Sequence, residues 1–179
     1  MSIAAAFAAD KEPPFRPAAA ASYSHQTSDQ VTIGVEPYIS AEKVKTAFGK
    51  LDPNQYGILP VLVVIQNDSA KTIRLKEMKV EYVGKTDRIE ATPAHDVRYL
   101  DGVRMPTAPS PIKLKKKNPL DAWEIEGRAF TAESLPPGNS AFGFFYFQAP
   151  LQADATIYVS GIKEAASGRE LLYFEVPVK

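Results

Sequence analysis

The sequence predicts a mainly β protein, an antiparallel β-sandwich that carries one or two short helical insertions. Residues 58–65 hold seven apolar side chains and one proline, and residues 140–148 hold five aromatic side chains. Short runs of this kind, bounded by polar turns, are typical of strands that are buried on both faces. Fifteen prolines against ten glycines also favour a loop-rich β protein over a helical bundle, and a small barrel is the alternative architecture.

The first 29 residues are expected to lie outside the domain, which we place at residues 30–179. Residues 1–22 are mostly Ala and Pro, and Ala6-Phe7-Ala8 has the small-x-small form that precedes a signal-peptidase cleavage site. We therefore expect residues 1–29 to be a signal-peptide remnant followed by a disordered Ala/Pro-rich linker. A disordered, Ala-rich start without export is the other interpretation.

The next segments predict a strand, a helix and the central strand. Val31, Ile33 and Val35 alternate with small or polar residues, as in a strand with one buried face. Ser40 is suited to cap a short helix over residues 40–48, and Gly49 is suited to end it. The central strand, whose apolar run fills residues 58–65, then turns at Asn67-Asp68-Ser69, a triplet that also matches the glycosylation acceptor pattern.

The partner of the central strand, residues 72–83, changes the phase of its alternation. Ile73 and Leu75 are odd-numbered, whereas Met78, Val80 and Tyr82 are even-numbered. Because side chains along a strand alternate with period two, both sets can face one core only if a residue is inserted between them. We predict a β-bulge or a break near Lys76-Glu77.

The remaining segments predict irregular structure followed by strands. Thr92-Pro93 and Asn118-Pro119 are helix starts, the second with Trp123 and Ile125 turned inward. Further strands are expected over residues 129–135, 140–148, 157–159 and 171–178, which gives about seven in all.

Charge and composition argue against several classes of partner. Lys plus Arg and Asp plus Glu balance at 21 each, so no global field attracts nucleic acid or anionic lipid. The basic run over residues 113–117 contains no aromatic side chain on which a base could stack. No window reaches the roughly 20 apolar residues that a transmembrane helix needs. We therefore expect no nucleic-acid partner and no transmembrane segment in this chain.

No set of residues in the sequence matches a catalytic or metal site. Ser40-Ala-Glu-Lys43 lacks the companion motifs of serine acylating enzymes, and Cys is absent. The predicted domain contains a single histidine, which excludes a His-rich zinc site. We expect no enzyme activity, no metal and no cofactor. The densest group of functional side chains is a candidate surface binding site, and a solvated turn is the alternative; its members are His95, Asp96, Arg98 and Tyr99.

Two segments of the sequence resemble a known type of domain. Leu62-Val-Val-Ile-Gln-Asn67-Asp-Ser followed by Ile73-Arg-Leu75 is similar to the paired strands of immunoglobulin-like accessory domains of exported bacterial proteins whose function is unknown. The segment from Leu135-Pro-Pro-Gly-Asn-Ser140 to Gly143-Phe-Phe-Tyr-Phe147 resembles their turn and Gly-aromatic strand, and water-stress domains of late-embryogenesis proteins have a similar pair. The resemblance covers residues 57–82 and 129–178. It implies an immunoglobulin-like sandwich and export, and it assigns no functional residue.

These observations predict a non-enzymatic, exported β-sandwich, periplasmic or extracellular. Such a domain would act as a protein–protein interaction or structural accessory module in the cell envelope, with another envelope or secreted protein as its partner. One alternative is a carrier of a small hydrophobic ligand or lipid, in which the aromatic strand lines a cavity between the sheets. A third hypothesis is a hydrolase that uses His95 with Asp96.

Overall fold

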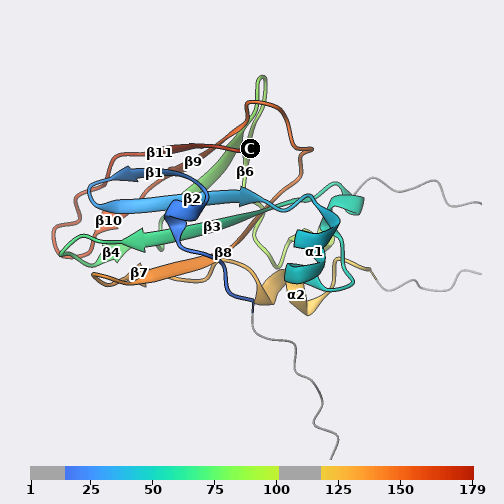
Figure 1. Cartoon of the computed structure of the whole chain (residues 1–179), viewed down its shortest axis with the longest axis horizontal. Coiled ribbons are helices and arrows are strands. Elements are labelled where there is room, and N and C mark those ends of the chain that lie inside the picture. The colour runs from blue at the N-terminus through green and yellow to red at the C-terminus, as the bar shows by residue number, and fades with distance from the viewer. Residues whose placement is uncertain (1–14, 101–117) are drawn as a thin grey trace, which may run out of the picture.

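The computed structural model describes residues 15–100 and 118–179, and Figure 1 shows the arrangement of its elements. Within these residues the chain is mainly β, with antiparallel sheets and two short α-helices. The predicted fold class is confirmed at this level. The basic run over residues 113–117 lies outside the described residues.

The strands form three sheets. The β3 sheet has the order β1 (Ser24–Ser28), β2 (Val31–Pro37), β3 (Leu59–Asn67), β8 (Ser140–Phe147). The β9 sheet has the order β11 (Phe174–Pro177), β9 (Thr156–Ser160), β5 (Lys79–Val83), β6 (Arg88–Glu90). The small sheet has the order β10 (Lys163–Glu164), β4 (Ile73–Arg74), β7 (Ser134–Leu135). The helices are α1 (Ala41–Phe48) and α2 (Trp123–Gly127), with 3₁₀ turns η1 (Ala20–Ser22), η2 (Pro53–Tyr56) and η3 (Val97–Tyr99).

Strands β3 and β8 separate two hydrophobic clusters. On the inner face of the β3 sheet, Val63 and Phe147 join the core shared with the β9 sheet and the small sheet. On the outer face, Leu62 and Phe144 join a second cluster, which Val44, Ala47 and Phe48 of α1 complete. Because side chains on a strand alternate between faces, two apolar surfaces require the continuous apolar runs seen in the sequence.

The alternation of apolar residues changes phase near Lys76-Glu77 because one strand ends and the next begins there, as predicted. Strand β4 ends at Arg74 and β5 begins at Lys79, and the turn between them is closed by a hydrogen bond from Met78 N to Leu75 O (3.0 Å). The chain passes here from the small sheet to the β9 sheet. Leu75 and Val80 consequently face the same core despite their opposite parity.

The predicted caps of α1 are also confirmed. The Ser40 side chain accepts a hydrogen bond from Lys43 N (3.4 Å), and Gly49 ends the helix with φ +63°. An oxygen at the N-cap satisfies a backbone N–H that has no partner within the helix. The Ser40 side chain is therefore explained by capping, and the Lys43 side chain pairs with Glu36 Oε1 (2.6 Å).

The expectation of a disordered linker is wrong for residues 15–29, which form η1 and β1; residues 1–14 lie outside the described residues. Strand β1 pairs with β2 through a turn in which Asp29 and Gln30 have positive φ. On its other side, Ser24 Oγ donates to Pro177 O (2.6 Å) and Gln26 Oε1 accepts from Glu175 N (2.6 Å). These bonds hold a strand whose side chains are all polar, and they place the start of the domain before residue 30.

Three details of the prediction do not match the structure. The chain forms eleven strands in three sheets within the described residues, so the strand order does not establish an immunoglobulin-like topology. Residues 129–135 contribute only the two-residue strand β7. Trp123 points to solvent whereas Ile125 is buried. Among the described residues, no helix has the length and hydrophobicity needed to cross a membrane.

Candidate functional site

The four predicted site residues lie together on η3 and the turn before it. Arg98 is the centre of this group: its guanidinium contacts Asp121 Oδ1 (2.7 Å) and Glu126 Oε1, and its Nε donates to His95 O (3.1 Å). The ring of His95 lies 3.5 Å from the Asp96 carboxylate. Because its carboxylate partners lie at or near α2, Arg98 holds η3 against the segment that contains this helix.

This group is open to solvent and contains no set of metal ligands. Tyr99 is largely exposed, and His95 and Asp96 have exposed side chains. No group of three metal-ligating side chains occurs in the described part of the chain. The ion pairs of Arg98 explain the position of the group in structural terms, and its role as a binding site stays a prediction.

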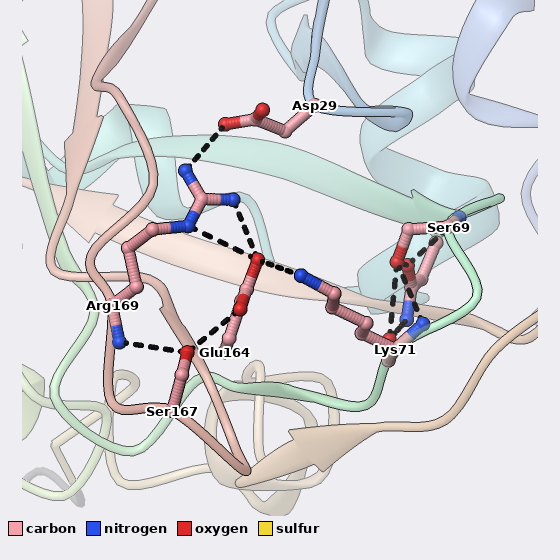
Figure 2. Close-up of polar contacts among 7 residues, drawn as sticks. Asp29, Ser69, Lys71, Glu164, Ser167 and Arg169 are labelled. Atoms are coloured by element: carbon pink, nitrogen blue, oxygen red, sulfur yellow. Dashed lines mark hydrogen bonds and ion pairs between the residues drawn. The ribbon is translucent and has the colours of Figure 1, made fainter.

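A second polar cluster surrounds Glu164, whose side chain is only 7% exposed (Figure 2). Oε1 accepts from Lys71 Nζ (2.8 Å) and from Arg169 Nη2 (2.5 Å), and Oε2 accepts from Ser167 Oγ (2.7 Å). The hydrogen bond from Lys71, followed by those from Ser167 and Arg169, lowers the pKa of Glu164 to about 2. Arg169 also reaches Asp29 Oδ2 at 3.8 Å, so the cluster joins three turns at one end of the sheets.

The fully buried Asn67 lies beside this cluster. Its Nδ2 donates to Lys71 O (2.8 Å) and Leu135 O (2.9 Å), and its Oδ1 accepts from Ser69 Oγ (2.7 Å). The donors and the acceptor of the Asn67 amide therefore all have partners inside the protein, which agrees with the tight turn expected at Asn67-Asp68-Ser69.

An open hollow of about 340 Å³ adjoins Lys71, Glu164 and Arg169 of the cluster around Glu164. Because Glu164 already accepts from both cations, we assign the cluster a structural role.

The outer edge of β8 offers a different kind of site. Phe144 N donates to Arg128 O (2.8 Å), Phe144 O accepts from Phe130 N (3.2 Å), and Tyr146 O accepts from Thr92 N (2.8 Å). Even-numbered residues of β8 therefore direct their backbone groups away from β3, because hydrogen-bonded and non-hydrogen-bonded pairs alternate in an antiparallel ladder.

The same parity applies to Ser140 and Phe142, which lie opposite Gln66 and Val64 of β3. Their two N–H and two C=O groups point outward, and no residue in the described ranges makes a hydrogen bond to them. The free edge ends at Gly143, where the backbone of Phe130 passes so close that a Cβ would lie 2.3 Å from its Cα. A short length of strand is thus left without a neighbour.

An apolar groove of about 560 Å³ runs beside this free edge. Residues 15–19 form one wall, Ser140 and Phe142 of β8 lie along it, and Val64 and Gln66 also line it. Phe142 is 43% exposed although it belongs to a core strand. Arg16 is the one charged residue among those that line the groove.

Aromatic rings and an arginine continue this surface toward α2. The ring of Phe15 lies 6.2 Å from that of Phe142, and the guanidinium of Arg128 lies 5.3 Å from the Phe15 ring. The guanidinium of Arg128 also lies 5.9 Å from the Trp123 ring, and Trp123 is 69% exposed. We call the following six residues the β8-edge surface: Phe15, Arg16, Trp123, Arg128, Ser140 and Phe142.

Sequence patterns did not identify the β8-edge surface. The sequence predicts an inward Trp123, and the aromatic run predicts that Phe142 belongs to a strand buried on both faces. Gly143 was the available signal, because a glycine inside a strand marks a close approach of another backbone. That approach at Gly143 is what ends the free edge.

The comparisons with known proteins find similarity in structure alone. No protein-family model matches the chain, and no curated protein matches it in sequence. YcdA of Bacillus subtilis, a candidate lipoprotein, shares 10% identity at a TM-score of 0.42 over 87% of this chain and 38% of its own. A functionally unknown protein of Listeria monocytogenes shares 14% identity at a TM-score of 0.42 over 87% and 82%.

An archaeal complex is also similar. The archaellum periplasmic stator complex of FlaF and FlaG from Sulfolobus acidocaldarius shares 16% identity at a TM-score of 0.33, over 64% of this chain and 76% of that one. The neighbours include a candidate lipoprotein and a periplasmic complex, and the present chain spans 38% of the length of the B. subtilis chain. The similarity is remote and concerns the fold alone.

Proposed function

We propose that this chain is a non-enzymatic protein-interaction module that binds an extended segment of a partner polypeptide along the free edge of β8. One observation carries the proposal: the outward N–H and C=O groups of Ser140 and Phe142 have no partner within the described residues and border an apolar groove. An added strand satisfies such groups with its own backbone, and adjacent side-chain contacts give specificity.

The contrast with β1 and β11 supports this choice of edge. These two strands lie at the ends of their sheets, and side chains of β1 bond to the backbone of β11 through Ser24 and Gln26. Proteins commonly cover or block exposed edges because unpaired strands invite association. The edge at Ser140 and Phe142 lacks such a cover among the described residues, which favours a binding role.

The carrier hypothesis has less support. Phe144 and Phe147 are buried in two different clusters, so the aromatic strand fills cores on both of its faces. The hollow that touches Phe144, Phe145 and Tyr146 measures about 220 Å³. Ligand pockets typically enclose about 300–1,000 Å³, and the larger groove beside Ser140 and Phe142 lies along a strand edge, not between the sheets. We therefore favour the interaction module over the carrier.

We further propose that the module acts outside the cytoplasm, in the periplasm or at the cell envelope. The support for this location is the pattern Ala6-Phe7-Ala8 in the sequence. Fractionation of the native host followed by N-terminal sequencing tests it. Recovery of the intact chain in the cytoplasmic fraction alone would refute export.

Photo-crosslinking in the native host tests the binding edge. Benzoylphenylalanine replaces Phe142, with the same probe at Tyr173 as the control, because Tyr173 is half exposed and stacks on Tyr158 of the β9 sheet. We expect a partner peptide to be crosslinked from position 142 and absent from position 173. Equal labelling from both positions would overturn the proposal.

A matched pair of substitutions at Ser140 sharpens this test. Ser140→Pro removes one outward N–H at the first residue of β8, a position where strands tolerate proline, whereas Ser140→Ala keeps the N–H. The crosslink from position 142 should be lost with proline and kept with alanine. Retention with both variants at equal yield would show that the backbone edge is not used.

A further inference from the structure

We infer that the bound segment is acidic, with a carboxylate side chain that pairs with Arg128 while Arg16 adds positive charge along the groove. This inference rests on the proposed function and adds the chemistry of the partner. It follows from the state of the two arginines next to the free edge. Neither guanidinium makes an ion pair with a carboxylate within residues 15–100 and 118–179.

Three other arginines of the described residues differ in this respect, whereas Arg74 donates only to the backbone oxygen of Ala165. Arg88 pairs with Glu81, Arg98 with Asp121, and Arg169 with Glu164. The net charge of the chain is zero, so the local excess of cations at the β8-edge surface does not come from a general positive charge. A partner with negative charge complements it, and complementary charge directs both encounter and specificity.

Arg128 is also held in position before any partner arrives. Its Nε donates to Ala47 O (3.0 Å), and its guanidinium lies near the rings of Phe15 and Trp123. A planar guanidinium fixed in this way loses little freedom when a carboxylate binds it, and it can offer two parallel N–H donors. Trp and Arg are among the residue types most enriched in the energetic centres of protein interfaces.

The strand geometry gives the spacing of the partner's side chains. Residues two apart on a strand lie about 7 Å from each other and point to the same face. The ring of Phe15 lies 6.2 Å from Phe142 and 5.3 Å from the guanidinium of Arg128. If the segment places an apolar side chain over Phe142, a carboxylate two residues along lies on the same face, and the Phe15 ring links this surface to Arg128.

Three synthetic peptides test the inference. Each has the blocked sequence Thr-Val-Thr-X-Thr-Val-Thr, with X as Glu, Gln or Lys, and none contains tryptophan. Trp123 is the single tryptophan of the protein, so its fluorescence reports binding next to Arg128. We expect the Glu peptide to bind about fivefold more tightly than the Gln peptide, the Lys peptide to bind most weakly, and salt to reduce these differences.

Arginine variants supply the controls. Arg128→Gln and Arg16→Gln should reduce the preference for Glu over Gln and leave the affinity for the Gln peptide unchanged. Arg74→Gln should leave all three affinities unchanged, because Arg74 lies on the small sheet and donates to Ala165 O. A thermal melt confirms that each variant is folded.

The outcomes separate this inference from the proposed function. Equal affinity for the three peptides overturns the acidic partner and leaves strand addition at β8 standing. Absence of binding by any peptide, with the crosslink from position 142 still present, overturns this inference alone. Loss of both the peptide binding and the crosslink overturns the inference and the proposed function together.

Discussion

Replacing Gly143 with alanine should destabilise the fold and loosen the segment that ends the free edge of β8. A Cβ at position 143 would lie 2.3 Å from Phe130 Cα and 2.4 Å from Phe130 N, both of which are backbone atoms. Carbon atoms pack best about 3.5–4.0 Å apart, so the backbone at Phe130 must move by about 1 Å or accept severe strain.

The magnitude follows from the contacts at this position. If the segment stays in place, overpacking costs about 1–3 kcal/mol. If it moves, the hydrogen bonds from Phe144 N to Arg128 O and from Phe130 N to Phe144 O are lost, at about 1 kcal/mol each. Either route lowers the free energy of unfolding by about 2 kcal/mol.

Urea unfolding measures this change, with Gly138→Ala as the matched control. Gly138 has φ +73°, and a Cβ at this position would meet nothing within 4 Å, so its substitution costs only the backbone strain of about 1 kcal/mol. The Gly143 variant should also exchange the amide of Phe144 faster than the wild type. A Gly143 variant no less stable than the Gly138 variant would refute the close approach.

Three further substitutions test the buried polar groups. Asn67→Asp places a carboxylate where an amide donates to two carbonyls, and should cost about 3 kcal/mol in urea unfolding at pH 7. Tyr146→Phe removes the hydroxyl that donates to Ile125 O (2.7 Å) and should lower the free energy of unfolding by about 1–2 kcal/mol in the same assay. Burial raises the pKa of Tyr146 above its ordinary value, so this hydroxyl stays protonated. Glu164→Gln should lower the Tm above pH 4.5, with a difference from wild type that shrinks as the pH falls toward 2.

The sign of the Glu164 prediction follows from its lowered pKa. The carboxyl titrates near 2 in the folded protein and near 4.5 when unfolded, so its stabilising contribution is complete above pH 4.5. Protonation through the folded pKa removes that contribution. A Tm difference that stays constant between pH 7 and pH 2 would contradict the assignment, as would an Asn67→Asp or Tyr146→Phe variant of unchanged stability.

The elements predicted correctly from sequence depend on local patterns. The break at Lys76-Glu77 follows from the parity of buried side chains, and the helix ends at Ser40 and Gly49 follow from capping. The two-faced burial of β3 is encoded in its unbroken apolar run. Each of these signals lies within a few residues of the feature it determines.

The features missed from sequence depend on contacts between distant segments. Strand β1 has only polar side chains. It is held in place by pairing with β2 and by hydrogen bonds to the backbone of Glu175 and Pro177. Trp123 and Ile125 cannot share one face of α2, because residues two apart on a helix are rotated by about 200°. The free edge at Phe142 likewise depends on a separate segment, because the backbone around Phe130 forms hydrogen bonds with Phe144 of β8 but not with Phe142.

Amide hydrogen exchange at single-residue resolution tests the binding edge most directly. In the free protein, Ser140 and Phe142 should exchange rapidly, whereas Ala141 and Gly143, whose N–H groups face β3, should exchange slowly. Addition of the Glu peptide should slow exchange at Ser140 and Phe142. Slow exchange of these two amides in the free protein, or rates that the peptide leaves unchanged, would contradict a free edge that binds by strand addition.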